Sequence, residues 1–383
     1  MKTNLKKLLY SGVTLMSLGV LAACSSTSSS TTTSSSVTTS QSSTTSSNST
    51  SSDSSSSSID WSALPTTEVT LSNDGLKITE GGTYILTGST TAGVTVETDA
   101  NVRIILAGAD ISSSDTAAIN VISADNVELE IQDGTSNTVK DTSNHSDTNI
   151  EGAIHVEADL TITGNGNLTV EGNFQDGIVS TDDLVINAGN ITVTAVDDGI
   201  RGKDSLTING GTINVTAGGD GIKSTNDTDT TKGYTTITGG EITVKAGDDG
   251  IKAETALTID GGTITVSESL EALEGTNITI NGGTLDVYGS DDAINAASTT
   301  SSDIFIKVTG GDLKVAVGRG DTDAFDANGD IYISGGTIDV TAPTSAFDFD
   351  GTVEFTGGTV TVNGEQITQI TATGPGAGGH GGW

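Results

Sequence analysis

The strongest constraint on the fold is a short acidic corner that returns along the chain at nearly regular intervals. Its clearest copies read Asp197-Asp198-Gly199-Ile200-Arg201, Gly219-Asp220-Gly221-Ile222-Lys223 and Asp248-Asp249-Gly250-Ile251-Lys252. The acidic positions fall at 176, 198, 220, 249, 271, 292 and 323, so the intervals are 22, 22, 29, 22, 21 and 31 residues. A repeat near 22 residues is typical of a solenoid, in which each repeat stacks on its neighbours.

Each repeat also contains two strand-like pieces separated by a glycine pair. Leu206-Thr207-Ile208 precedes Gly210-Gly211, for example, and Ile213-Asn214-Val215 follows it. Apolar residues alternate with polar ones, as in a strand with one buried face, and glycine adopts the positive φ of a turn at low cost. With the corner as a third short strand, the sequence predicts an all-β fold, a parallel β-helix with about 22 residues per coil.

Equivalent residues of neighbouring coils should lie one strand spacing apart, about 4.8 Å. The apolar residue that follows each acidic corner is therefore expected to point inward and to stack with its equivalents. The predicted column contains Ile178, Ile200, Ile222, Ile251, Leu273, Ile294, Phe325 and Phe347.

The beginning of the chain differs from the repeats. Residues 1–23 resemble a bacterial export signal, with Lys2, Lys6 and Lys7 before an apolar stretch that ends at Cys24. This cysteine is the only one in the chain, and its position predicts lipid attachment rather than a buried thiol. We therefore expect an extracytoplasmic lipoprotein, anchored through Cys24 to the membrane at the bacterial cell surface.

The rest of the chain divides by composition. Residues 24–60 are rich in Ser and Thr and are expected to stay disordered, because they have little to bury. Residues 61–372 form the predicted β-helix, and residues 373–383 form a glycine-rich tail. The net charge of −35 makes nucleic acid an improbable partner, whereas it is compatible with cations. We expect a monomer.

The acidic corners predict a column of carboxylates. Asp capping its own turn explains part of this pattern, but it does not explain the longer Glu271 or the second acids of the corners. Carboxylates one strand spacing apart repel by roughly 3–4 kcal/mol at an effective dielectric constant near 20, and a divalent cation would bridge them. Oxygen ligands without neighbouring His or Cys favour calcium over zinc. The predicted calcium ligands are Asp197, Asp198, Asp220, Asp248, Asp249, Glu271, Glu274, Asp291 and Asp292.

Basic residues stand beside these acids. Arg201, Lys223 and Lys252 each follow the corner isoleucine and should point outward. Two interpretations stay open: local charge pairing with the carboxylates, or a catalytic base beside a calcium-bound uronate. The extra residues of the longer intervals fall near 225–233, 297–303 and 317–320, close to the corners. Loops on one side of a solenoid often mark its working face.

Together these features resemble a known bacterial family. They are the Cys24 signal, the Ser/Thr segment, the Gly81-Gly82-Thr83-Tyr84-Ile85-Leu86 motif, and the Asp-Gly-Ile-Lys corners with Gly-Gly-Thr turns. The chain looks like carbohydrate-binding domain-containing proteins with a right-handed parallel β-helix, calcium-binding relatives of the β-helix polysaccharide (pectate) lyases. The resemblance covers about residues 65–375 and implies a plant-type polysaccharide ligand, cellulose-like or polygalacturonate-like. In the related lyases a lysine near calcium is the base, and Lys223 and Lys252 are possible matches.

Our main hypothesis from the sequence is a surface-anchored, calcium-dependent protein that binds acidic or cellulose-like polysaccharide. One alternative is an enzyme, a polysaccharide lyase that cleaves uronate polymers by β-elimination on the same scaffold. A second alternative is a structural or adhesin stalk without a sugar site. An unsaturated, ultraviolet-absorbing product would distinguish the lyase from the other two.

Overall fold

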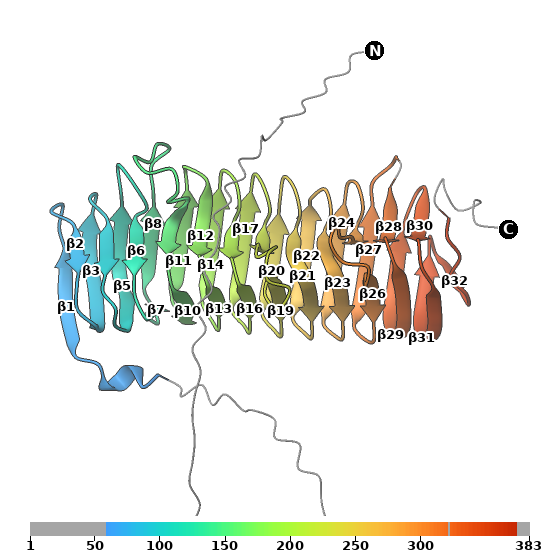
Figure 1. The fold of residues 1–383 in the computed structure, drawn as a ribbon, viewed down its shortest axis with the longest axis horizontal. Helices are drawn as coiled ribbons and strands as arrows, with labels where there is room; N and C mark the ends of the chain where they lie inside the picture. The colour runs from blue at the N-terminus through green and yellow to red at the C-terminus, as the bar shows by residue number, and fades with distance from the viewer. Residues whose placement is uncertain (1–58, 321, 374–383) are drawn as a thin grey trace, which may run out of the picture. The chain divides into compact units, whose positions relative to one another are not determined.

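The chain folds as a parallel β-helix in which successive coils stack strand upon strand (Figure 1). The computed structural model describes residues 59–320 and 322–373. The predicted signal, Cys24, nearly all of the Ser/Thr segment and residues 374–383 lie outside the described residues. Strand pairing is parallel throughout the described coils, except between the last two strands. This confirms the fold class predicted from the 22-residue repeat.

Three columns of strands build the coils, and we name them by their order within a coil. The corner strands are β2 (Leu76–Ile78), β4 (Val94–Glu97), β6 (Ile119–Ser123), β9 (Gly152–Val156), β12 (Asp176–Ser180), β15 (Ile200–Gly202), β18 (Ile222–Ser224), β25 (Ile294–Ala296), β28 (Asp323–Ala327), β30 (Ser345–Phe349) and the first parts of β21 (Ile251–Ile259) and β23 (Leu273–Ile280).

The second strands are β1 (Thr66–Leu71), β7 (Asn126–Ile131), β10 (Asp159–Gly164), β13 (Asp183–Ile186), β16 (Ser205–Ile208), β19 (Tyr234–Ile237), β26 (Phe305–Val308), the ends of β21 and β23, and the first parts of β3 (Gly82–Thr90), β5 (Val102–Ser112), β29 (Asp330–Thr341) and β31 (Val353–Val362). The third strands are β8 (Ser136–Lys140), β11 (Asn167–Gly172), β14 (Asn190–Ala195), β17 (Thr212–Ala217), β20 (Glu241–Lys245), β22 (Thr263–Glu268), β24 (Thr284–Gly289), β27 (Asp312–Val317) and the ends of β3, β5, β29 and β31.

The two ends of the β-helix depart from this pattern. A short 3-10 helix, η1 (Trp61–Ala63), precedes β1, and the Asp60 side chain caps it by accepting the Ser62 backbone N–H. At the other end β32 (Glu365–Ile367) pairs antiparallel with β31. Within the described residues we find no helix that is long and apolar enough to span a membrane.

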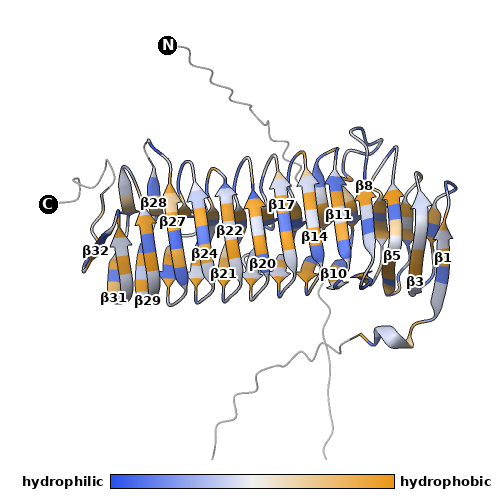
Figure 2. Cartoon of the chain, turned by 180° about the vertical axis from the view of Figure 1, so that it is seen from behind, coloured by the Kyte–Doolittle hydropathy of each residue, from blue (hydrophilic) through white to orange (hydrophobic). Residues whose placement is uncertain are grey.

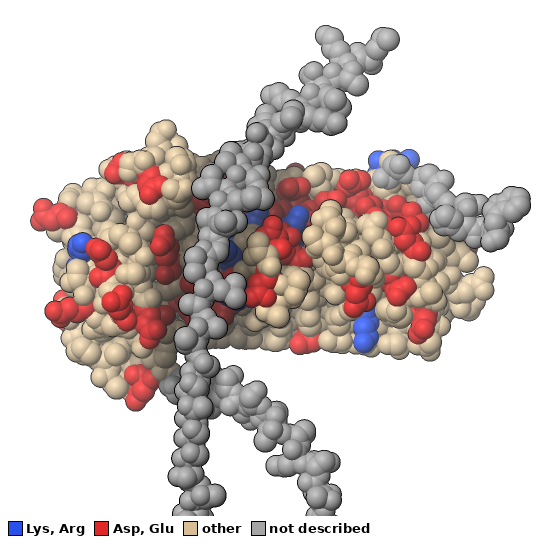
Figure 3. Space-filling view, in the orientation of Figure 1, with Lys and Arg blue, Asp and Glu red and all other residues tan. Residues whose placement is uncertain are grey.

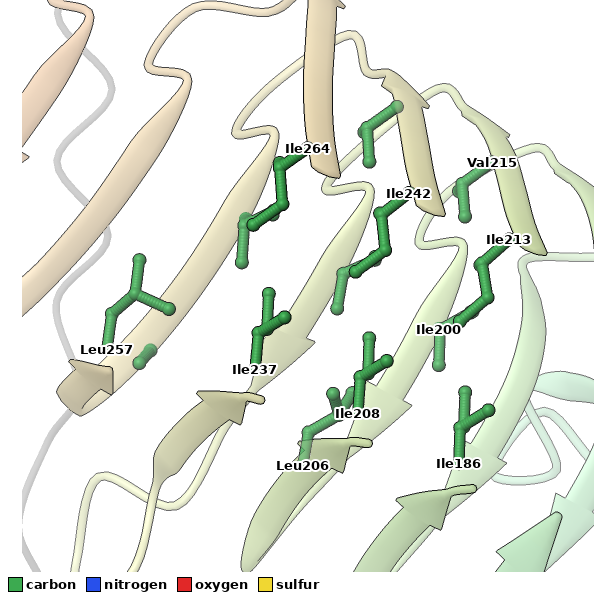
Figure 4. Close-up of a cluster of buried hydrophobic side chains, with 14 of the residues drawn as sticks. Ile186, Ile200, Leu206, Ile208, Ile213, Val215, Ile237, Ile242, Leu257 and Ile264 are labelled. Atoms are coloured by element: carbon green, nitrogen blue, oxygen red, sulfur yellow. The ribbon is translucent and has the colours of Figure 1, made fainter. Parts of the chain in front are cut away.

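The predicted apolar column is present in the strand register. Ile200 pairs with Ile222, Ile222 with Ile251 and Ile251 with Leu273, and the column continues to Phe347. Its predicted members, from Ile178 to Phe347, are between 0% and 2% exposed. Figure 4 shows the second and third strands adding further inward side chains, including Ile208 and Ile213, to the same interior. The alternation of apolar and polar bands along the strands is visible in Figure 2.

Glycine pairs make the turn between second and third strands. Gly211 has φ +98°, and a Cβ there would lie 2.8 Å from the Gly189 carbonyl oxygen of the preceding coil. A side chain would therefore be strained by the backbone conformation and would also clash with the stacked turn. The same turn recurs at the next coil, where Gly240 has φ +97°. The glycine pairs thus allow the coils to stack closely.

Candidate functional site

The predicted acidic column exists, and backbone hydrogen bonds hold its first part in place. Asp198 N donates to Asp176 Oδ1 at 3.1 Å, Asp220 N to Asp198 Oδ1 at 3.0 Å, and Asp249 N to Asp220 Oδ1 at 2.9 Å. All four Asp residues are 2–6% exposed. We call them the acidic ladder. Asp176, Asp198 and Asp220 each satisfy a buried backbone N–H of the next coil, which gives these carboxylates a structural role besides any chemistry.

The three basic residues predicted beside the acids lie against this ladder. Lys223 Nζ is 2.5 Å from Asp198 Oδ2 and 3.0 Å from Asp220 Oδ2. Lys252 Nζ is 2.7 Å from Asp249 Oδ2 and 2.5 Å from Glu274 Oε2. These two ammonium groups therefore offset part of the repulsion between carboxylates. From the sequence, a divalent cation was predicted to offset it.

Arg201 pairs with Asp176 at 3.0 Å and also contacts Glu151. Glu151 belongs to the segment 141–151, which connects β8 to β9 and lies at the same corner. This insertion precedes the regular repeats, so the repeat period did not predict it. Its polar run Ser-Asn-His-Ser-Asp-Thr-Asn at residues 143–149 was the available signal.

Both lysines are held in the charged form. Burial acts against the charge of Lys223, but Asp220 and Asp198 outweigh it and raise the pKa of its ammonium group. The pKa of Lys252 is also raised, because its hydrogen bonds to Asp249 and Glu274 outweigh its burial. A lysine that stays protonated is in the wrong form to abstract a proton.

The ladder ends in a group of carboxyls that we call the Asp249 cluster: Asp220, Asp248, Asp249, Glu271 and Glu274. Ligand oxygens of Asp220, Asp248 and Asp249 lie within 4.8 Å of one another. Asp249 Oδ1 is buried and has no hydrogen-bond donor. The position therefore offers several carboxylate oxygens around one unsatisfied acceptor, and this donor set suits Ca²⁺.

Proton affinities in this cluster are strongly perturbed. Burial raises the pKa of Glu271 and of Glu274, and the neighbouring Asp249 carboxylate raises both further. Burial also acts to raise the pKa of Asp249, but its contacts with Glu274, Glu271 and Lys252 outweigh this and hold it below its ordinary value. Carboxyls this close are all ionised only where a cation lies among them; otherwise at least one of them holds a proton.

Asp197 and Asp198 face the same corner from the preceding coils. A Cβ at Gly219 would lie 2.4 Å from Asp197 Oδ1 and 2.8 Å from Asp198 Oδ1. The glycine at this position thus leaves room for the two carboxylates. Burial raises the pKa of Asp197, and the Asp198 charge raises it further.

The remaining predicted ligands lie further along the column. Asp291 is exposed, and Asp292 Oδ1 accepts the backbone N–H of Asp323 at 2.7 Å. Neither belongs to the set of oxygens that converge near Asp249. Of the nine predicted ligands, Asp220, Asp248 and Asp249 are the three whose oxygens converge among the described residues.

A groove of about 720 Å³ adjoins the Asp249 cluster. The predicted insertions 225–233 and 297–303 both follow corner strands and form its walls, as β18 leads to β19 and β25 leads to β26. Residues that line the groove include Asp229, Lys252, Glu254, Glu274, Ser298 and Thr300. Figure 3 shows more acidic than basic side chains on the visible face. The groove is therefore polar and open, and it reaches the cluster through Lys252 and Glu274.

The fold and this site define a class: parallel β-helix proteins with a charged groove along one flank. The chain belongs to the family described as "Carbohydrate-binding domain-containing protein", which matches residues 72–324. This confirms the family resemblance found in the sequence.

A curated relative and a solved structure are similar to this chain. A carbohydrate-binding domain-containing protein from Acetivibrio thermocellus is 35% identical over 135 residues, which are 33% of this chain and 47% of the relative. The chain thus spans about half the length of that relative. The polysaccharide lyase-like protein from C. thermocellum, solved as a gadolinium derivative, is 33% identical with a TM-score of 0.53, covering 57% of this chain and 95% of its own.

Proposed function

We propose that this protein binds an acidic polysaccharide in the groove beside the Asp249 cluster and that the binding depends on calcium. The observation that carries the proposal is that the cluster reaches the groove: its member Glu274 lines the groove, and so does Lys252, which pairs with Asp249 and Glu274. Asp220, Asp248 and Asp249 would hold the ion, with Glu271 as a further neighbour. The ion would neutralise the cluster and offer a coordination position to a uronate carboxylate.

The protonation state of the basic residues favours binding of the polysaccharide over its cleavage. A general base works best with a pKa near the operating pH, whereas the pKa values of Lys223 and Lys252 are raised. Their ion pairs with the ladder also occupy them. Polygalacturonate incubated with the protein should therefore show no growth of ultraviolet absorbance, and such growth would support the lyase alternative instead.

Asp248→Asn tests the proposal with little effect on the fold, because Asp248 is exposed and the ladder does not use its side chain. The matched control is Asp339→Asn, an exposed acid on β29. In gels that contain polygalacturonate, calcium should retard the wild type and the control, and chelator should release both. Asp248→Asn should lose at least part of the retardation. Equal retardation of all three proteins with chelator present would contradict the proposal.

The hard cation in the related structure supports including lanthanides in this test. That relative was solved as a gadolinium derivative, and gadolinium, like calcium, prefers oxygen ligands. Gadolinium should therefore compete with calcium at the Asp249 cluster. Competition that Asp248→Asn leaves unchanged would place the ion elsewhere.

Surface anchoring is a separate part of the proposal and rests on the sequence. We infer that Cys24 carries a lipid after cleavage of residues 1–23. Cys24→Ala should move the protein from the membrane fraction to the soluble fraction. A variant that stays in the membrane fraction to the same degree would overturn anchoring through this residue.

A further inference from the structure

A second candidate site lies on the last coils, on the outer face of the second strands. There Lys307 of β26 pairs in register with Tyr332 of β29, and Tyr332 pairs with Glu354 of β31. A pocket of about 390 Å³ opens at this place, lined by Phe305, Tyr332 and polar residues. Its volume falls in the range of small-ligand pockets, about 300–1,000 Å³.

Two aromatic side chains form the apolar part of the pocket. The rings of Phe305 and Tyr332 are 6.2 Å apart with planes inclined at 67°, and both residues are half-buried. Tyr332 Oη donates to Asp330 Oδ2 at 2.6 Å, while Asp330 Oδ1 accepts the Thr352 backbone N–H at 2.6 Å. The tyrosine ring is therefore held in place before any ligand arrives, which lowers the entropy lost on binding.

Earlier coils carry no such pair in these register positions. Asn277 pairs with Phe305, and Thr279 pairs with Lys307, on the coil before. On the coil before that, the equivalents are Ala256 and Thr258. Small or polar side chains thus satisfy the fold at these positions, so the aromatic pair is not required for stacking the coils.

The chemistry of the pocket suits a sugar ring. The negative face of an aromatic ring attracts the weakly positive C–H groups on the flat face of a pyranose. A β-linked glucose unit, with its hydroxyl groups equatorial, has such a face on both sides. The pocket's rim supplies hydrogen-bonding groups for these hydroxyls from Lys307, Ser334, Glu354 and Thr356.

Both the pocket and the groove are lined by more acids than bases, but within the described residues the pocket has no group of converging carboxylates beside it that could hold a metal ion. Such a group is formed by Asp220, Asp248 and Asp249, next to the groove. The lining of the pocket contains Asp303 and Glu354 against the single cation Lys307. A uronate carboxylate placed there would meet two like charges, whereas a neutral sugar would not. We propose that this pocket binds a neutral β-linked glucan segment without calcium. The inference is independent of the proposed function, because it uses neither the Asp249 cluster nor the groove beside it.

The test is calorimetric titration of the full chain with cellohexaose in the presence of chelator. Tyr332→Thr should weaken binding at least tenfold, and the fold should tolerate it because Thr279 and Thr258 occupy the equivalent positions. Phe305→Ala provides a second variant that removes the other ring. Tyr332→Phe should retain most of the affinity, since the ring remains and only the bond to Asp330 is lost.

Tyr234→Ala is the matched control, because Tyr234 is 38% exposed on β19, another second strand. It should leave cellohexaose binding unchanged. The proposal is overturned if the wild type does not bind cellohexaose, if chelator abolishes the binding, or if Tyr332→Thr and Phe305→Ala both bind as the wild type does. A failure here leaves the calcium-dependent retardation by polygalacturonate untouched, so the two proposals fail separately.

Discussion

In the column of corner strands, an early half (β15, β18 and β21) and a late half (β23, β25, β28 and β30) carry side chains of different charge beside their acids. In one register position of these strands, β15, β18 and β21 carry Arg201, Lys223 and Lys252. The same position on β23, β25, β28 and β30 carries Glu274, Asn295, Asp326 and Asp348. The backbone register is shared, so basic side chains of one group of coils are replaced by neutral or acidic ones at the same place in the next.

This comparison locates the place where the chain's own cations end. Up to Lys252 each ladder carboxylate has a cation within ion-pair distance. Beyond it, burial and the neighbouring Asp292 and Asp323 raise the pKa of Asp326 to about 7. The Asp249 cluster lies at this boundary. The cluster sets five carboxyls against two lysines, Lys223 beside Asp220 and Lys252 between Asp249 and Glu274. This excess of carboxyls is the reason for proposing an external cation at that position.

The largest expected effect concerns what the two halves share. Ile222→Asp and Ile294→Asp each place an unpaired charge in the apolar column, at residues with 0% exposure. Each should lower the free energy of unfolding by several kcal/mol. Thr216→Asp, at an exposed position of β17, is the control and should change it little. Urea unfolding measures all three, and an unchanged midpoint for either isoleucine variant would contradict the inward column.

The next effect is specific to the early half. Lys223→Met removes the ammonium group between Asp198 and Asp220 and leaves two buried carboxylates without it. We expect a loss of roughly 1–3 kcal/mol, less than for a fully buried pair because the lysine is partly exposed. Asn295→Lys makes the opposite change in the late half and should stabilise it by up to about 1 kcal/mol. Urea unfolding measures both variants, and changes of the same sign in their free energies of unfolding would contradict the comparison.

A smaller effect should appear in the pH dependence of the late half. The folded pKa of Asp326, about 7, lies above the ordinary 3.8, so the folded chain binds the proton more tightly than the unfolded chain. Its contribution to stability is complete below about pH 4 and is lost as the pH rises through 7. Asp326→Asn removes that loss.

The Asn variant should therefore be more stable than the wild type at about pH 8, by roughly 1–2 kcal/mol after allowance for solvent screening. At about pH 4 the two proteins should have nearly equal stability. Thermal melts at both pH values measure the difference. A difference of equal size at both would show that the carboxyl of Asp326 titrates normally.

The sequence predicted the parts of the structure that depend on the repeat itself. A fixed period determines which residues stack, so the column through Ile222 and Ile251 followed directly from spacing. The position of Asp220 beside Asp249 followed for the same reason. How much of the ladder needs a cation depends on which carboxylates Lys223 and Lys252 contact. Strand spacing alone does not determine those contacts.

Other contacts lay beyond the reach of the repeat. Arg201 contacts Glu151, 50 residues earlier, through an insertion that no period describes. Phe305 and Tyr332 come together across coils of unequal length, so counting residues does not align them. In both cases a loop changes the register between the two partners, and only the folded chain brings them into contact.

Calorimetric titration of calcium into the wild type and Asp249→Asn tests the central claim most directly. Asn retains the size of Asp249 and its capacity for the turn, but it removes the charge at the centre of the cluster. The wild type should bind calcium tightly, and Asp249→Asn should weaken that binding at least tenfold. Unchanged stoichiometry and affinity in the variant would show that the Asp249 cluster is not a calcium site.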